Sequence, residues 1–334
     1  MNSTAVLEHY LRPLQRWLKE DGVTEIVINR PGEVGIERRQ TWSWHEVPEL
    51  SPEWLMTLAL AAAAFTRQDV GPERPICSTT LPGGARCQIV VPPVTDGPSA
   101  VFTIRRRNDR ELTLDDLAIQ GFFETVEQER KHAGPEEERL LGYMHRHDWL
   151  SFFAAAVQTR KNIIVSGATG SGKTTFARSL ILQIPREERL VTIEDARELA
   201  APHRNLVHLV YAKDGAGLAR VGAKDLLESA LRMRPDRIIM QELRDASAFF
   251  YLRNVASGHP GSITTVHAQS PRLAFEQLTL LIRESEAGRD LSRPDISELL
   301  RGLIDIVVQT RRVEGRFRVT EVYYDPQKRG PQGF

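Results

Sequence analysis

Residues 167–175 read Gly-Ala-Thr-Gly-Ser-Gly-Lys-Thr-Thr, and this stretch decides how the surrounding chain folds. The pattern G-x-x-x-x-G-K-[ST], from Gly167 to Thr174, is typical of a phosphate-binding loop, whose glycines let backbone N–H groups point at phosphates. Lys173 is expected to charge-pair with the β- and γ-phosphates, and the Thr174 hydroxyl is expected to hold Mg²⁺. The predicted nucleotide-binding residues are Gly167, Ala168, Thr169, Gly170, Ser171, Gly172, Lys173, Thr174 and Thr175.

The residues on either side of the loop supply the required context. Residues 161–166 form a short apolar, β-branched run that predicts a buried strand. Residues 176–182 predict a helix that ends before Pro185. Strand, glycine-rich loop and helix together favour a triphosphate site over the alternative, a glycine-rich turn that binds nothing.

Composition and charge narrow the class of protein. The chain has 334 residues, 41% of them hydrophobic and 26% charged, which is typical of a soluble globular protein with about two domains. Lys+Arg and Asp+Glu both total 44, so the formal net charge is zero, which argues against a nucleic-acid-binding protein. A local basic face that binds nucleic acid is the remaining alternative. Cys77 and Cys87 cannot form a four-thiolate zinc site; a disulfide between them is conceivable, but we expect reduced thiols in the cytosol.

The sequence contains no evident secretory signal or membrane span. The first residues are polar, and the longest apolar run, Trp54 to Phe65, is shorter than the roughly 18 residues of a span. A buried helix is favoured there over a membrane-surface helix, because no Lys/Arg-rich face accompanies it.

The N-terminal part predicts an α+β domain, residues 1–125, with a mainly antiparallel sheet. Turn residues separate strand candidates from one another, and helices are expected at about 5–20 and 52–66. Residues 126–140 are strongly polar and predict an exposed, charged linker. The strand candidates are 25–29, 86–91 and 100–104.

Residues 141–325 alternate apolar strand runs with helical stretches, which predicts a parallel α/β sheet. The tail, 326–334, is expected to be disordered. The strand candidates are 162–166, 189–194, 237–241, 262–267 and 304–310.

Polar residues that end three of these strands are candidates for catalysis. Glu194 with Asp195, and separately Glu242, follow apolar runs and are therefore expected at the carboxyl edge of the sheet, where open α/β folds bind ligands. Nucleotide hydrolysis needs an acid near the metal and a group that positions water. His267 ends another strand and is a candidate for sensing the γ-phosphate. Acidic loop caps and a histidine satisfied at a strand end are the alternatives.

Several segments in this order resemble the secretion-ATPase superfamily, which includes type IV secretion and conjugation ATPases, type II secretion ATPases and type IV pilus motors. They look like its Walker A motif, Asp box, atypical Walker B motif and His box. Two segments are most similar to the type IV secretion branch: Arg-Met-Arg-Pro-Asp-Arg and Gly-His-Pro-Gly-Ser. One departure is Gln241, which stands where the family usually has Gly before Glu242. The segments are 167–175, 192–195, 231–244 and 257–268.

The resemblance implies a C-terminal RecA-like ATPase domain that uses ATP and Mg²⁺. It also implies a homohexameric ring, cytoplasmic and peripherally attached to the inner membrane through inner-membrane components of a type IV secretion system. Nucleotide would sit between the two domains of one subunit, so that Arg105 reaches the phosphates; a guanidinium suits a transferring phosphoryl group. Without the resemblance, Arg105-Arg106-Arg107 would be interpreted as a solvated basic linker.

The function predicted on this basis is ATP-driven domain movement that powers substrate transfer or pilus assembly. The predicted catalytic residues are Glu242, Glu194, His267 and Arg105. Glu242 is expected to position or activate water, and His267 to read the γ-phosphate. Glu194 is expected to assist through the metal or its waters, with Asp195 as a further candidate for that part. A pilus-retraction motor is the near alternative. A nucleic-acid motor and a nucleotide-gated assembly scaffold are alternatives of other classes, the first disfavoured by the zero net charge and the second by the intact Glu242.

Overall fold

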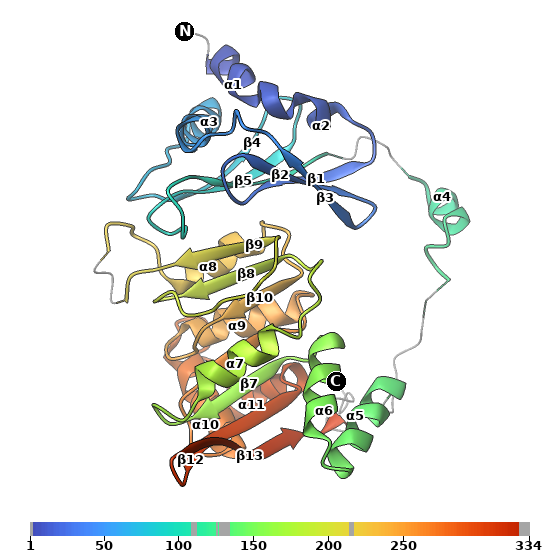
Figure 1. The fold of residues 1–334 in the computed structure, drawn as a ribbon, viewed down its shortest axis with the longest axis vertical. Coiled ribbons are helices and arrows are strands. Elements are labelled where there is room, and N and C mark those ends of the chain that lie inside the picture. Colours follow the sequence, from blue (N-terminus) through green and yellow to red (C-terminus); the bar gives the residue numbers. More distant parts are fainter. Residues whose placement is uncertain (1–2, 108–111, 125, 127–133, 214–216, 327–334) are drawn as a thin grey trace.

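The computed structural model describes residues 3–107, 112–124, 126, 134–213 and 217–326. The N-terminal sheet lies above the C-terminal sheet in Figure 1, and residues 112–124, here called the arm, lie to one side of both. The predicted linker residues 127–133 and tail residues 327–334 lie outside the described residues. No helix in the described part of the chain is long and apolar enough to cross a membrane.

The N-terminal region is a six-stranded antiparallel sheet in the order β3-β2-β1-β6-β5-β4, covered on one face by helices. The three strands predicted here are confirmed as β1, β5 and β6. The predicted helix at 5–20 is interrupted by a short 3₁₀ segment at Arg12–Leu14, because Pro13 has no backbone N–H to donate. The elements are α1 (Ser3–Leu11), α2 (Gln15–Lys19), β1 (Val23–Ile28), β2 (Glu33–Arg38), β3 (Thr41–Glu46), α3 (Pro52–Phe65), β4 (Ile76–Thr80), β5 (Arg86–Val90) and β6 (Val101–Arg105).

The C-terminal region is an α/β domain, as predicted. Strands β10-β8-β9 pair in parallel, and β11-β7-β12 pair in parallel with β13 added antiparallel at the edge. A parallel bridge between Leu243 and Val266 joins the two groups of strands. The strands are β7 (Ile163–Gly167), β8 (Leu190–Glu194), β9 (Leu206–Val210), β10 (Arg237–Met240), β11 (Ile263–Val266), β12 (Ile306–Val313) and β13 (Arg316–Tyr324).

Helices cover both faces of this sheet, and strands β7, β8, β10 and β11 are buried along their whole length. One buried cluster joins β7 and β12 to α6 and α7, and another joins β8 and β10 to α8, α9, α10 and α11. The helices are α5 (Pro135–His145), α6 (Trp149–Gln158), α7 (Lys173–Ile181), α8 (Ala223–Ala230), α9 (Ser247–Ala256), α10 (Pro271–Glu284) and α11 (Arg293–Leu303).

The second face of the N-terminal sheet packs on the C-terminal domain beside β9 (Figure 1). Arg189, fully buried just before β8, donates hydrogen bonds to Asn29 Oδ1 (2.8 Å) and Thr103 Oγ1 (3.1 Å). Gln88 on β5 donates to Ser229 Oγ on α8 (2.9 Å). Since Arg189, Thr103, Gln88 and Ser229 are buried, these hydrogen bonds help to hold the two domains in one orientation.

The arm between the domains carries α4 (Leu114–Ile119), which stands away from both domains in Figure 1. The next helix, α5, begins at Pro135, inside the predicted linker 126–140, and packs against α6. The remaining boundaries of the predicted domains stay predictions.

Candidate active site

The phosphate-binding loop runs from the carboxyl end of β7 to the first residue of α7. Its shape requires glycine: Gly172 has φ +91°, a left-handed value that side chains disfavour. A Cβ on Gly167 would lie 2.3 Å from Ser171 Oγ and 2.5 Å from Thr310 Oγ1. Lys173 and Thr174 open α7, so the loop amides and the positive end of the helix face the same space.

Lys173 is largely buried, and its ammonium bonds to the loop. Nζ donates to the carbonyls of Gly167 (2.9 Å) and Ala168 (3.0 Å) and lies 3.4 Å from His267 Nδ1. Burial lowers the pKa of Lys173, and the negative charge of Glu242 partly offsets this effect. An ammonium held by replaceable carbonyl contacts is available to phosphate oxygens.

Glu242 lies at the carboxyl edge of the sheet, as the sequence predicted, and there it meets His267. Nε2 of His267 lies 2.8 Å from Oε1 of Glu242. An ammonium can only donate and a carboxylate can only accept, so a neutral His267 with its proton on Nε2 satisfies both Lys173 and Glu242. Lys173, His267 and Glu242 therefore form one continuous polar chain below the loop.

Arg244 is a site residue that sequence reasoning missed. Its guanidinium forms an ion pair with Asp195 and lies 3.8 Å from Oε2 of Glu242. Burial lowers the pKa of Arg244, but the carboxylates of Glu242 and Asp195 outweigh it, so the net pKa is raised. The available signal was its place two residues after Glu242, beyond the end of β10.

Gln241 forms a hydrogen bond beside the site. Its Oε1 accepts from the backbone N–H of Asp195 (3.2 Å), and its carbonyl accepts from Thr265 Oγ1 (2.9 Å). Gln241 thus ties the end of β10 both to the loop after β8 and to β11. The side chain of Gln241, which stands where the family usually has Gly, therefore adds a hydrogen bond to the backbone of Asp195.

Glu194 does not join this group. It is fully buried, and its carboxylate accepts from Thr192 Oγ1 (2.8 Å) and from the amides of Glu198 (2.8 Å) and Leu199 (2.7 Å), with His208 Nδ1 at 3.2 Å. Burial alone would raise the pKa of Glu194, but these hydrogen bonds hold it below its usual value. All of these partners belong to β8, β9 and the loop that follows β8. These contacts indicate that Glu194 holds the loop after β8, which carries Asp195, in its conformation.

Arg105 is not brought to the phosphate loop of its own chain. Arg105 is the last residue of β6. Thr103 on the same strand accepts a hydrogen bond from Arg189, which precedes β8, so β6 lies near the amino end of the parallel strands. The phosphate-binding loop follows the carboxyl end of β7, at the opposite edge of the sheet. The Arg105 side chain is 57% exposed and pairs with Glu25 on β1. Burial raises the pKa of Glu25 despite this arginine. Nucleotide between the domains of one subunit, with Arg105 at its phosphates, is therefore not the arrangement seen here.

A parallel α/β domain with this loop, a buried lysine and a Glu–His pair at the carboxyl strand edge defines a P-loop ATPase with a RecA-like fold. The model of the type II/IV secretion system protein family matches residues 138–313, and the chain belongs to that family of secretion ATPases.

Related proteins match over nearly the whole chain. The type IV secretion system protein VirB11 of Bartonella henselae is 48% identical, covering 98% of this chain and 95% of the relative. VirB11 of Brucella suis is 43% identical, covering 96% of this chain and 91% of the relative. The crystal structure of the VirB11 ATPase from the Brucella suis type IV secretion system, in complex with sulphate, has a TM-score of 0.91 at 41% identity, covering 97% and 99% of the two chains.

Proposed function

We propose that this chain is a Mg²⁺-dependent ATPase that powers substrate transfer or pilus assembly in a type IV secretion machine. The observation that carries the proposal is the continuous chain from Lys173 through His267 to Glu242 below the loop. Such a chain links the group that binds phosphates to the group suited to activate water, as phosphoryl transfer requires.

Each residue has a role that its surroundings support. The loop amides and Lys173 bind the β- and γ-phosphates. Glu242 positions the attacking water and accepts its proton. As the water oxygen bonds to the γ-phosphorus, the bond from the γ-phosphorus to the bridging β-phosphate oxygen breaks. The products are ADP and phosphate. His267 holds Glu242 in place until His267 turns toward the γ-phosphate. Arg244 fixes the second oxygen of Glu242.

The loop also fits a Mg²⁺-nucleotide. The glycine cradle has no room for a Cβ at Gly167, and Thr174 places a hydroxyl in the first turn of α7. Thr174 would hold Mg²⁺, which supplies charge neutralisation on the phosphates when bound. We assign Glu194 an indirect part, through the loop that carries Asp195.

The proposal extends to assembly and place of action. A homohexameric ring, bound to inner-membrane components at the cytoplasmic face of the inner membrane, is supported by the similarity to VirB11 proteins. Arg105 keeps a proposed role in hydrolysis. That role requires the N-terminal domain to move, or Arg105 to serve the loop of a neighbouring copy, because it does not reach its own loop here.

Purified full-length protein tests the proposal directly. We expect Mg²⁺-dependent release of phosphate from ATP that Lys173→Ala abolishes. Lys224→Ala, at an exposed lysine on α8, is the matched control and should keep the wild-type rate. Vigorous turnover by Lys173→Ala would refute the assignment. Arg105→Ala should fold normally and hydrolyse more slowly; an unchanged rate removes Arg105 from the site.

A further inference from the structure

Strand β12 runs beside β7 and continues past the residue at which β7 turns into the phosphate-binding loop. Gln309 and Thr310 on β12 pair with Ser166 and Gly167, the last two residues of β7. Because β12 continues to Val313, its remaining side chains lie beyond the end of β7. The last part of β12 therefore lies at the edge of the sheet that carries the candidate active site.

Thr310 fixes the middle of the phosphate-binding loop to the sheet. Its hydroxyl donates to the carbonyl of Ser166 (3.1 Å), so its oxygen accepts from the Ser171 hydroxyl, which lies 2.9 Å away. The Ser171 proton thus points at the sheet. Gly167 is packed against both hydroxyls, since an added Cβ there would lie 2.3 Å from Ser171 Oγ and 2.5 Å from Thr310 Oγ1. Two buried hydroxyls therefore hold the loop in this conformation.

Gln309 holds the turn that follows His267. The buried side-chain amide of Gln309 donates to the carbonyl of Ala268 (3.3 Å), the residue directly after His267. Arg311, two residues further along β12, donates to the carbonyl of Gln269 (2.8 Å). Strand β12 therefore holds two successive carbonyls of this turn.

The alternation of side chains along β12 explains how two neighbouring residues reach different parts of the site. Val308 packs in the buried cluster with α6 and α7, and Thr310 shares that face of the sheet. Val307 packs in the cluster with α8, α9, α10 and α11, and Gln309 shares that opposite face. The phosphate-binding loop leads into α7 and the turn after β11 leads into α10, so each side chain lies on the same face as the segment that it holds.

We propose that Thr310 is a positioning residue for the phosphate-binding loop and that Gln309 is a positioning residue for His267. Each acts through the segment that it holds. A loop that is ordered before nucleotide arrives loses less conformational freedom on binding, so Thr310 should act on affinity. His267 contacts Glu242, so Gln309 should act on turnover. The inference rests on the proposed function and deepens it.

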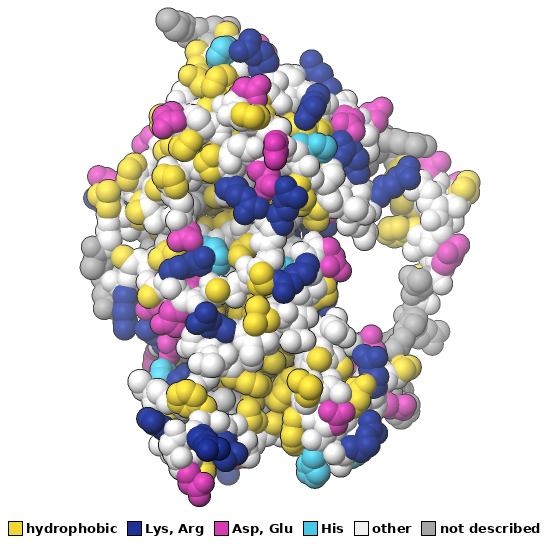
Figure 2. Space-filling model, in the orientation of Figure 1, with side chains coloured by type: hydrophobic (Ala, Val, Ile, Leu, Met, Phe, Trp, Pro, Cys, Tyr) yellow, Lys and Arg dark blue, Asp and Glu magenta, His cyan; other side chains and the backbone are white. Residues whose placement is uncertain are grey.

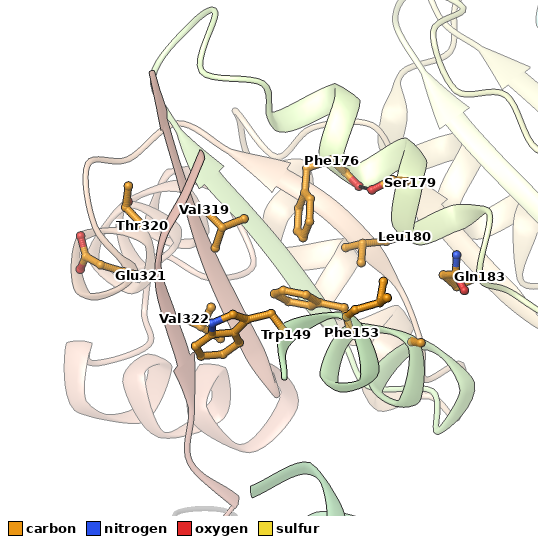
Figure 3. A pocket seen from close by; sticks show the side chains of 12 residues that line it. Trp149, Phe153, Phe176, Ser179, Leu180, Gln183, Val319, Thr320, Glu321 and Val322 are labelled. Carbon is orange, nitrogen blue, oxygen red and sulfur yellow. Dashed lines mark hydrogen bonds between the residues drawn. The ribbon is translucent and has the colours of Figure 1, made fainter. Parts of the chain in front are cut away.

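Apolar packing holds the β12–β13 hairpin in place beside these hydrogen bonds. Figure 3 shows Val319 of β13 facing Phe176 of α7. Figure 2 shows hydrophobic side chains gathered over the lower part of this face, where α6 and β13 lie. Phe317 also lies against the loop, since an added Cβ on Gly172 would be 2.8 Å from its ring. Loss of one hydroxyl or one amide should therefore leave the hairpin folded.

Nucleotide affinity tests the part assigned to Thr310. Thr310→Val keeps the shape of the side chain and removes the hydroxyl. We expect the Kd of the full-length protein for fluorescent methylanthraniloyl-ADP with Mg²⁺ to rise roughly 3- to 10-fold, while kcat stays within about twofold of wild type. Thr310→Ser keeps the hydroxyl and should keep the affinity.

A buried threonine far along α10 supplies the matched control for this measurement. The Thr279 hydroxyl donates to the carbonyl of Phe275 (2.9 Å), so Thr279→Val loses a comparable hydrogen bond outside the site. Equal Kd values for the valine variants of Thr310 and Thr279 contradict the proposal. A Kd for Thr310→Ser as high as that for Thr310→Val contradicts it too.

Turnover tests the part assigned to Gln309. Gln309→Met keeps the length of the side chain and removes the amide, and we expect kcat to fall roughly 3- to 10-fold with an unchanged Kd for the same ADP probe. Added to His267→Ala, Gln309→Met should lower kcat no further, because it acts through His267. An additive loss in the double variant, or a Kd that rises as kcat falls, would overturn this assignment.

These measurements separate the positioning roles from the proposed function. If the wild-type protein hydrolyses ATP and both variants match it in Kd and kcat, only the positioning roles are wrong. If the wild-type protein does not hydrolyse ATP, the proposed function and the part assigned to Gln309 are wrong, and ADP affinity still decides the part assigned to Thr310.

Discussion

Nε2 of His267, which follows β11, lies 2.8 Å from Oε1 of Glu242, which follows β10. The pair is therefore held by two neighbouring strand ends. On its other side His267 faces Lys173, whose ammonium bonds to its own loop carbonyls. Glu242, which we propose as the base, and Lys173, which we propose to bind phosphate, are therefore both engaged in polar contacts within the protein.

Replacing His267 should separate binding from turnover. His267→Ala removes the group between Lys173 and Glu242, and we expect kcat to fall about 10- to 100-fold while nucleotide affinity changes little. Steady-state hydrolysis combined with equilibrium nucleotide binding measures both quantities. An unchanged kcat would show that His267 is only a satisfied histidine at the end of a strand.

Arg244 should act through Glu242. Arg244→Ala frees Glu242 and leaves Asp195 without its ion pair, so kcat is expected to drop about tenfold with a nearly unchanged KM. Arg244→Lys keeps the charge and should recover part of the rate. Arg253→Ala, at an exposed position on α9, is the matched control. Equal rates for the alanine variants of Arg244 and Arg253 would remove Arg244 from the site.

Gln241 should stabilise the loop after β8. Gln241→Ala loses the hydrogen bond from the Asp195 amide but keeps the backbone contact with Thr265. We expect the free energy of unfolding to fall by about 1 kcal/mol and kcat to fall severalfold. Urea denaturation and phosphate release are the measurements. Wild-type values in both would show that this side chain is incidental.

The pKa of Glu194 predicts a pH dependence of stability. Its folded pKa lies below the ordinary value of 4.5, so the ionised form stabilises the fold above that pH and the contribution is lost as pH falls through the folded pKa. Glu194→Gln should cost on the order of 2 kcal/mol at pH 7. The difference from wild type should shrink below about pH 4.5. A difference independent of pH would contradict this assignment.

Much of the catalytic domain could be predicted from local sequence. Strands β7, β8, β10 and β11 are apolar runs that end abruptly in polar residues, and in a parallel sheet such ends meet at one edge. That rule placed Glu242 at the edge where the structure also has His267. Strand β13 was missed because it is exposed on most of its length and alternates arginine with apolar residues, which does not distinguish an edge strand from a loop.

The remaining site features depend on pairing that no local pattern contains. His208 reaches Glu194 only because β9 pairs with β8 in the register that sets Thr192 beside His208. The position of Arg105 depends on how the N-terminal sheet docks, through buried contacts such as Arg189 with Thr103. The sequence suggested a role for Glu194, and the family resemblance suggested one for Arg105, but neither revealed which groups these two side chains contact.

The central claim is that Glu242 drives turnover in a site whose nucleotide binding depends on Lys173 and the loop. Glu242→Gln keeps the shape of the side chain and removes its charge, and Glu228→Gln, exposed on α8, is the control. Single-turnover hydrolysis and nucleotide affinity should be measured on the same preparations. The account predicts affinity close to wild type with hydrolysis at least about 100-fold slower. Hydrolysis by Glu242→Gln at the rate of Glu228→Gln would contradict it.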